Sequence, residues 1–466
     1  ILIKNLAAIV MAALLVGFNF VEKLDQSISN SVKYLKDRQQ GQGYWAGAFV
    51  SDVSFDALTL ALGKKLGLLS DDLKLEIFNS IISRIDPSRE GWTTYIGGPI
   101  DRDVTGITLL ALESVGYSEG DSRLVKAWQW FRANGHIKGL GWIAKSHLVP
   151  LGLVDKNSIP SIPAGILGLP KIAPLQIEKL GHVKGILIPV IGWRALSELK
   201  DDSLSEEFKS NEAWLHENLS IGTFKVGGSA TFWAKQAVAN SLQERNPSGT
   251  WYGVSFTIVN LLLLQEAQRV GLGDFRKQFQ QGWQGILNWR AVSNEGFSFQ
   301  QIISSNIWDT SNTISAFHQL KNTKWYDSQI EEMAKSGTQW LKNQFVPNLG
   351  WSFDGSDKTL PDLDTTAAAI HSLAENKETE PTLTALDWIL ENQNDDGGFP
   401  AWNKGVSKKL FQLMAKFYPD MPDIADISQT DVTSRILVVL STLEKQGVVS
   451  KQLLAPIRER ACDFIL

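Results

Sequence analysis

Cysteine is almost absent from this chain. Among its 466 residues only Cys462 carries a thiol. One thiol cannot form an intramolecular disulfide, so the sequence excludes a disulfide framework. It also excludes a zinc site built from several cysteines. Such sparing use of cysteine is typical of an intracellular protein.

An excess of positive charge is also missing. There are 45 Lys and Arg against 50 Asp and Glu, a net charge of −5. Because nucleic-acid-binding proteins present a basic patch to the phosphates, we expect no nucleic-acid partner.

No apolar run reaches the roughly 20 residues that a membrane-spanning helix needs. The run from Leu6 to Phe18 is shorter than that. We expect residues 1–24 to form an apolar helix that lies on or in a membrane surface. Two alternatives are a helix packed on the protein and a signal peptide, although no A-x-A-like cleavage site follows the run.

Tryptophan is abundant, with 17 residues against 7 tyrosines. Several of these tryptophans lie in a repeated pattern, in which a Gly-aromatic turn is followed by an apolar helix that begins near Asp. The turns and helix starts are Gly43-Tyr44-Trp45 and Asp56, Gly91-Trp92 and Asp103, Gly350-Trp351 and Asp364, and Gly398-Phe399 and Asp431, with further helices near Ser255 and Asp309. Repeated helix pairs of this kind share one core.

The second helix of each pair is the more apolar one, as expected for a buried helix. We therefore predict an all-α fold: a single α/α barrel over residues 25–466, with the apolar helices inside. Most tryptophans should pack between helices. The stretch 159–191 departs from the pattern, because its prolines break any regular helix. Its apolar character favours a membrane or channel segment, and the alternative is a buried linker.

Asp364, in Pro361-Asp362-Leu363-Asp364-Thr365, is the candidate for acid chemistry. It could simply cap a helix, because Asp is a preferred N-cap and recurs at this position in the other repeats. Three features favour an acid: the expected position at the mouth of the barrel, the second carboxylate of Asp362, and the flanking aromatic residues. Burial and a neighbouring ionised carboxylate both help a carboxyl group to retain a proton. A protonated carboxyl can protonate an alkene, and aromatic faces then stabilise the carbocation.

The stretch Asp362-Leu363-Asp364-Thr365-Thr366-Ala367 resembles the Asp-x-Asp-Asp-Thr-Ala motif of the squalene–hopene cyclases, which are class II terpene cyclases. The Gly-aromatic turns resemble the QW repeats of that family. The resemblance implies that Asp364 is the catalytic acid and Asp362 its acidic neighbour. It implies that Trp308 and Phe353 stabilise cations and that Trp402 lies near the cavity. It further implies no cofactor, and attachment to the cytoplasmic side of a membrane.

Two residues depart from that motif. Thr365 replaces the third Asp, and Arg435 stands where the family has a histidine. Because Arg is always charged, beside Asp364 it would favour the ionised carboxylate. Alternatively it keeps Asp362 ionised, hydrogen-bonds the acid, forms a structural ion pair, or binds an acidic group of the substrate.

The chain is shorter than the family's two-barrel members and resembles the shortened, monodomain cyclases that make meroterpenoids. We therefore predict that Asp364 protonates the terminal alkene or epoxide of a linear polyprenyl substrate, such as a prenylated aromatic acid. Deprotonation or water capture would end the cyclisation. The alternatives are a squalene or diphosphate cyclase and a non-catalytic isoprenoid carrier. An inverting glycosidase is disfavoured by the apolar flanks of the acid, and a zinc prenyltransferase subunit by the lack of cysteine.

Overall fold

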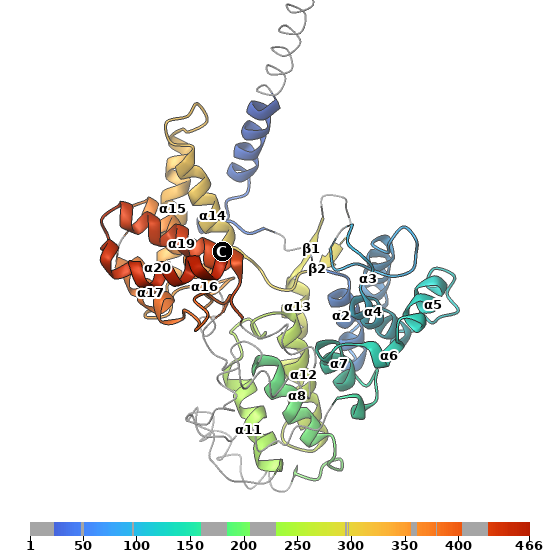
Figure 1. Ribbon diagram of the computed structural model, residues 1–466. Helices are drawn as coiled ribbons and strands as arrows, with labels where there is room; N and C mark the ends of the chain where they lie inside the picture. Colours follow the sequence, from blue (N-terminus) through green and yellow to red (C-terminus); the bar gives the residue numbers. More distant parts are fainter. Residues whose placement is uncertain are drawn as a thin grey trace, which may run out of the picture.

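A computed structural model describes residues 23–47, 51–95, 97–159, 184–205, 230–293, 296, 298–355, 361–378, 380–402 and 427–466. The described residues are mostly helical (Figure 1), which confirms the all-α prediction. Residues 1–22 of the predicted N-terminal helix lie outside the described residues, as do residues 160–183 of the predicted membrane segment.

A first group of elements follows a helix over residues 23–36 and precedes a short hairpin. These elements are α2 (Ser54–Leu66), α3 (Asp71–Ser83), α4 (Arg102–Ser114), α5 (Val125–Ala133), α6 (His136–Gly139), α7 (Trp142–Leu151), the 3₁₀ turn η1 (Lys156–Ser158), α8 (Lys184–Leu196), α11 (Ala230–Gln243), α12 (Val254–Arg269) and α13 (Arg276–Asn288). The hairpin pairs β1 (Arg290–Val292) with β2 (Ser298–Gln300) in antiparallel register. After it come α14 (Asn306–Gln319), α15 (Ser328–Gln344), α16 (Leu363–Glu375), α17 (Glu380–Glu391), α19 (Thr430–Lys445) and α20 (Lys451–Ile465).

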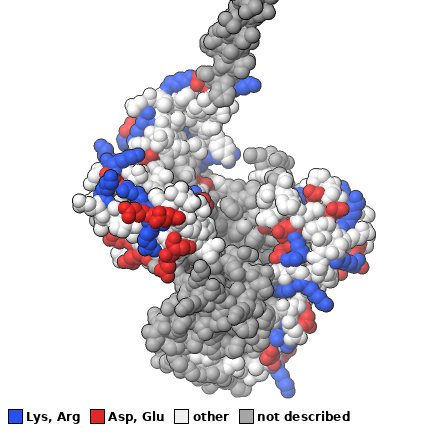
Figure 2. Space-filling model, viewed as in Figure 1, with Lys and Arg blue, Asp and Glu red and all other residues white. Residues whose placement is uncertain are grey.

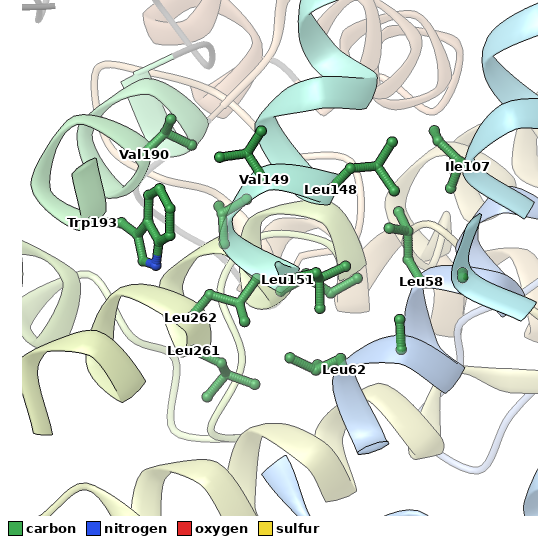
Figure 3. Close-up of a cluster of buried hydrophobic side chains, with 14 of the residues drawn as sticks. Leu58, Leu62, Ile107, Leu148, Val149, Leu151, Val190, Trp193, Leu261 and Leu262 are labelled. Carbon is green, nitrogen blue, oxygen red and sulfur yellow. The ribbon is translucent and has the colours of Figure 1, made fainter. Parts of the chain in front are cut away.

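The buried apolar side chains form two clusters. The first draws on residues 53–286, and Figure 3 shows side chains of α2, α4, α7, α8 and α12 that belong to it. The second draws on residues 307–461 together with Val32 and Trp45. We call these two parts the α2–α13 half and the α14–α20 half. The boundaries predicted from the sequence, 1–24 and 25–466, stay a prediction.

Hydrogen bonds explain the repeated Gly-aromatic turn. In each repeat the backbone N–H of the aromatic residue donates to a Thr hydroxyl in the following buried helix. The tryptophans also donate their indole N–H to a carbonyl at the end of the preceding helix. The bonds to the Thr hydroxyl are Trp92 to Thr105, Trp251 to Thr257, Trp351 to Thr366 and Phe399 to Thr433, at 2.9–3.0 Å. These aromatic residues are therefore structural ties between paired helices.

One repeat is assembled from distant parts of the chain. The N–H of Trp45 donates to Thr310 on α14 over 2.9 Å, and its indole donates to Leu35 at the end of the first helix. The expected pairing of this turn with the helix at Asp56 is therefore wrong. Residues 23–47 complete the α14–α20 half, and the whole α2–α13 half is inserted between them and α14.

The apolar stretch predicted to face a membrane ends inside the protein. Its last residues belong to α8, where Leu187, Ile188 and Ile191 are each at most 3% exposed in the first cluster. For these residues the alternative of a buried segment is correct. Within the described ranges, no helix is long and apolar enough to cross a membrane. On the face shown in Figure 2, acidic and basic side chains are intermixed over both halves.

Candidate active site

Asp362 is the N-cap of α16. Its backbone is extended, and its carboxylate accepts the N–H of Thr365 over 2.6 Å. Its own N–H donates to the carbonyl of Trp351 over 3.1 Å. A cap of this kind satisfies one of the free N–H groups at the helix start. The alternative that Asp364 serves as the cap is therefore wrong, because Asp362 fills that position.

Asp364 lies in the first turn of α16 and forms an ion pair with Arg435 on α19. Its carboxylate oxygen Oδ1 contacts Nη1 of Arg435, and its side chain remains 26% exposed. The backbone N–H groups of Leu363 and Asp364 both point at the carbonyl of Ala401, at 2.8 and 3.3 Å. The start of α16 is thus held between α19 and the loop after α17.

The equivalent Asp in three other repeats has a different use. In each case the carboxylate accepts a backbone N–H from a distant segment and so holds that segment in place. These contacts are Asp56 with Gln300 at 3.0 Å, Asp103 with Gly141 at 3.0 Å and Asp309 with Gly47 at 2.6 Å. Among the described residues, the carboxylate of Asp364 contacts only the side chain of Arg435. Asp364 therefore differs from these three residues in having an arginine side chain, and no described backbone N–H, as its partner.

Arg435 is placed by three neighbours. Its guanidinium carbon lies 4.5 Å from the centre of the Trp308 ring, a cation–π contact from α14. Partial burial lowers the pKa of Arg435, while the negative charge of Asp362 raises it. Arg remains protonated near neutral pH. The site therefore combines two carboxyl groups and one fixed positive charge.

Aromatic side chains extend from this cluster. The rings of Trp308 and Phe353 lie 6.3 Å apart at an angle of 31°. Trp402 follows Ala401, and its ring meets the ring of Tyr252 edge-to-face at 5.2 Å. Tyr252 belongs to the α2–α13 half, so this contact joins the two halves beside the start of α16.

The structure thus brings together Asp362, Asp364, Trp308, Phe353 and Arg435, and it places Trp402 beside them through Ala401. The sequence did not indicate Tyr252, because its partner lies 150 residues away and no motif marks it. Among the described residues, no group of three His, Cys, Asp or Glu side chains could hold a metal ion.

Comparisons with known proteins identify the family to which the chain belongs. The model of the squalene–hopene cyclase N-terminal domain matches residues 28–209, and that of the C-terminal domain matches residues 304–466. Squalene–hopene cyclase of Alicyclobacillus acidocaldarius is 22% identical, with 88% of this chain and 70% of that enzyme covered.

Two solved structures also match. ent-Copalyl diphosphate synthase from Arabidopsis thaliana has a TM-score of 0.50 at 11% identity, covering 94% of this chain and 52% of that one. The match to the type II terpene cyclase MstE from Scytonema covers 81% of each chain at 13% identity, with a TM-score of 0.19. The first likeness concerns the fold alone, and the second is too low to compare geometry. On the strength of the two domain models, which together match most of the chain, this protein belongs to the squalene–hopene cyclase family and is a class II terpene cyclase.

Proposed function

We propose that Asp364 protonates the terminal alkene or epoxide of a linear polyprenyl substrate and so starts its cyclisation. The observation that carries this proposal is the setting of Asp364. Within the part of the chain that the structure describes, its carboxylate accepts no backbone N–H, whereas the same position holds distant segments in three other repeats. Its partly exposed side chain leaves room for a substrate carbon to approach. Trp308, whose ring contacts Arg435, then stabilises the developing cation through its ring.

The guanidinium of Arg435 at first opposes this role, because a positive neighbour favours the ionised carboxylate. Charge balance resolves the difficulty. Arg435 interacts with both Asp362 and Asp364, and one carboxylate is enough to balance one guanidinium. With both ionised the cluster has a net charge of −1. Because a net charge is costly once water is excluded, one shared proton is favoured.

In this proposal Asp362 keeps the negative charge and Asp364 holds the proton. Asp362 accepts the N–H of Thr365, and such a bond favours the charged form of a carboxylate. Nη1 of Arg435 lies against Oδ1 of Asp364, so in this proposal the proton resides on Oδ2. When that proton moves to the alkene, Arg435 is already in place to stabilise the new carboxylate.

A substitution at Arg435 tests whether Asp364 holds the shared proton while Asp362 stays ionised. In Arg435→Gln, loss of the positive charge should move the alkaline limb of the pH–rate profile to higher pH. The maximal rate should fall by about 10²-fold, because the conjugate base loses its preorganised donor. Initial rates from pH 5 to 9 give both quantities. An alkaline limb that stays in place or moves to lower pH would contradict the shared-proton arrangement.

Arg435→Lys is the matched control for charge. It retains a cation but loses the planar donor that stacks on Trp308. We expect its alkaline limb to stay within about half a pH unit of wild type, with an intermediate rate. A shift as large as that of Arg435→Gln would assign the effect to packing rather than charge.

We further propose a prenylated aromatic acid as the substrate. The resemblance to the shortened meroterpenoid cyclases supports this substrate. Arg435 adds no support, because it pairs with Asp364 and is not assigned to an acidic group of the substrate. A panel of a prenylated aromatic acid, its methyl ester, squalene and a prenyl diphosphate would identify the class. Cyclisation ended by deprotonation leaves the mass of the substrate unchanged, and water capture adds one water molecule. Turnover of squalene or the diphosphate alone would contradict the proposed substrate.

Membrane attachment is likewise a proposal, supported by the apolar composition of residues 1–22 and 160–183. Co-flotation of the chain with phospholipid vesicles would test it. Recovery of all the protein in the lipid-free fraction would contradict it.

A further inference from the structure

A buried Ser–His pair lies in the α2–α13 half. Nε2 of His147, on α7, is 2.6 Å from Oγ of Ser255, in the first turn of α12. His147 is 2% exposed and Ser255 is 9% exposed. Both residues are buried, and Ser255 retains more exposed surface than His147.

The hydrogen bonds determine where the imidazole carries its proton. Nδ1 of His147 lies 2.9 Å from the carbonyl oxygen of Ile143, which can only accept. Nδ1 is therefore protonated, and Nε2 accepts the hydroxyl proton of Ser255. Burial lowers the pKa of His147, so the imidazole is neutral near pH 7. The pair is arranged as a base with a hydroxyl in front of it.

The start of α12 faces the active-site half of the molecule. Tyr252, three residues before Ser255, contacts Trp402, whose neighbour Ala401 accepts the N–H groups at the start of α16. The N–H of Val254 donates to Ile302 over 2.9 Å, in the segment that leads into α14 and Trp308. The turn that carries Ser255 is thus connected to both segments that flank Asp364.

We propose that Ser255 and His147 accept the proton that ends the cyclisation, an inference that rests on the proposed function. A C–H bond next to the final carbocation breaks, and its electron pair forms the alkene. The proton passes to Oγ of Ser255 while the hydroxyl proton of Ser255 passes to Nε2 of His147. The products are an alkene, a neutral serine and an imidazolium, so the charge of the cation moves to His147. Because burial disfavours the charged imidazole, His147 then returns the proton to solvent when the product leaves.

The product spectrum tests this role. Ser255→Ala and His147→Phe remove the hydroxyl and the base, so the cation should persist until water captures it. We expect the ratio of alkene to water adduct to fall by about 10²-fold in each variant, the usual contribution of a positioned base. The rate of substrate consumption should fall less than about tenfold, because Asp364 is untouched.

Ser146→Ala is the matched control. Ser146 is buried on the same helix and lies 3.3 Å from Nδ1 of His147, on the side away from Ser255. This variant should keep the wild-type product ratio. Ser255→Ala adds no bulk, so it decides the question alone if His147→Phe does not fold.

An unchanged product ratio in a folded Ser255→Ala enzyme would overturn the inference, since a purely structural pair would alter stability but not products. A wild-type enzyme that releases mainly the water adduct would also overturn it. The proposed function fails separately, and this inference with it, if the wild type cyclises none of the panel or if Asp364→Asn retains full activity.

Discussion

Replacing Asp364 with Asn should reduce cyclisation by at least about 10³-fold. An amide cannot supply the proton. The other described carboxyl group at the start of α16 belongs to Asp362, which serves as the N-cap. General acid catalysis typically contributes 10²–10⁴-fold, and an alkene is so weak a base that water is a poor substitute. Product formation by mass spectrometry at saturating substrate measures the loss.

The substitution should leave folding and binding largely intact. Asn has nearly the shape of Asp, and the side chain accepts no backbone N–H from the described residues. We expect the denaturation midpoint to remain close to that of wild type and the affinity for substrate to change by less than about tenfold. Full cyclisation by Asp364→Asn would refute the assignment of the acid. A variant that neither folds nor binds would show instead that the ion pair with Arg435 is structural.

In contrast to Asp364→Asn, Asp56→Ala should greatly lower the free energy of unfolding. The carboxylate of Asp56 is fully buried and contacts Arg84, Nη1 of Arg290 at 3.0 Å and the N–H of Gln300 at 3.0 Å. Both arginine side chains are about nine-tenths buried. Removing Asp56 takes the buried anion away from both arginines, and Arg290 keeps only its contact with the more exposed Glu76 at 3.1 Å. Loss of one partner of a buried ion pair typically costs about 3–5 kcal/mol. Urea unfolding followed by tryptophan fluorescence measures this loss.

Asp431→Ala serves as the control for Asp56. Asp431 occupies the same repeat position in the first turn of α19, and it is exposed. Its loss should cost less than about 1 kcal/mol, the usual effect of a charge near a helix end. Equal losses in the two variants would show that the ion pairs of Asp56 contribute little to stability.

Asp56 and Asp364 together show how one repeat position serves two purposes. The sequence places both at the start of an apolar helix, and the structure confirms both helix starts. Their side-chain partners come from residues distant in the chain: Arg84 and Gln300 for one, Arg435 for the other. Repetition therefore predicts the local fold, while the use of each carboxylate depends on contacts that local patterns do not encode.

Elements that depend on local hydrogen bonding are predictable from the sequence. The helix starts follow from apolar periodicity and capping, and the all-α class follows from the repeats. The two apolar clusters were not foreseen, because the turn at Trp45 reads like the others although its hydroxyl partner is Thr310. The end of the stretch 159–191 was misjudged for a related reason. Apolar composition alone does not distinguish a membrane-facing segment from a buried helix such as α8.

Arg435 shows what the structure added at the site. The sequence left several roles open for it, from a structural ion pair to a substrate ligand. In the structure it pairs with Asp364 and forms a cation–π contact with Trp308, and the negative charge of Asp362 raises its pKa. That arrangement favours a role in balancing the charge of the two carboxyl groups.

Solvent deuterium reports directly on protonation by Asp364. The carboxyl proton of Asp364 exchanges with water, so cyclisation of a substrate with a terminal alkene in D2O should deliver one deuterium to the carbon that is protonated first. We expect the wild-type product to gain one deuterium at the former terminal alkene and Asp364→Asn to form almost no labelled product. A cyclised product without deuterium at that carbon, or equal labelling by Asp364→Asn, would contradict protonation by Asp364.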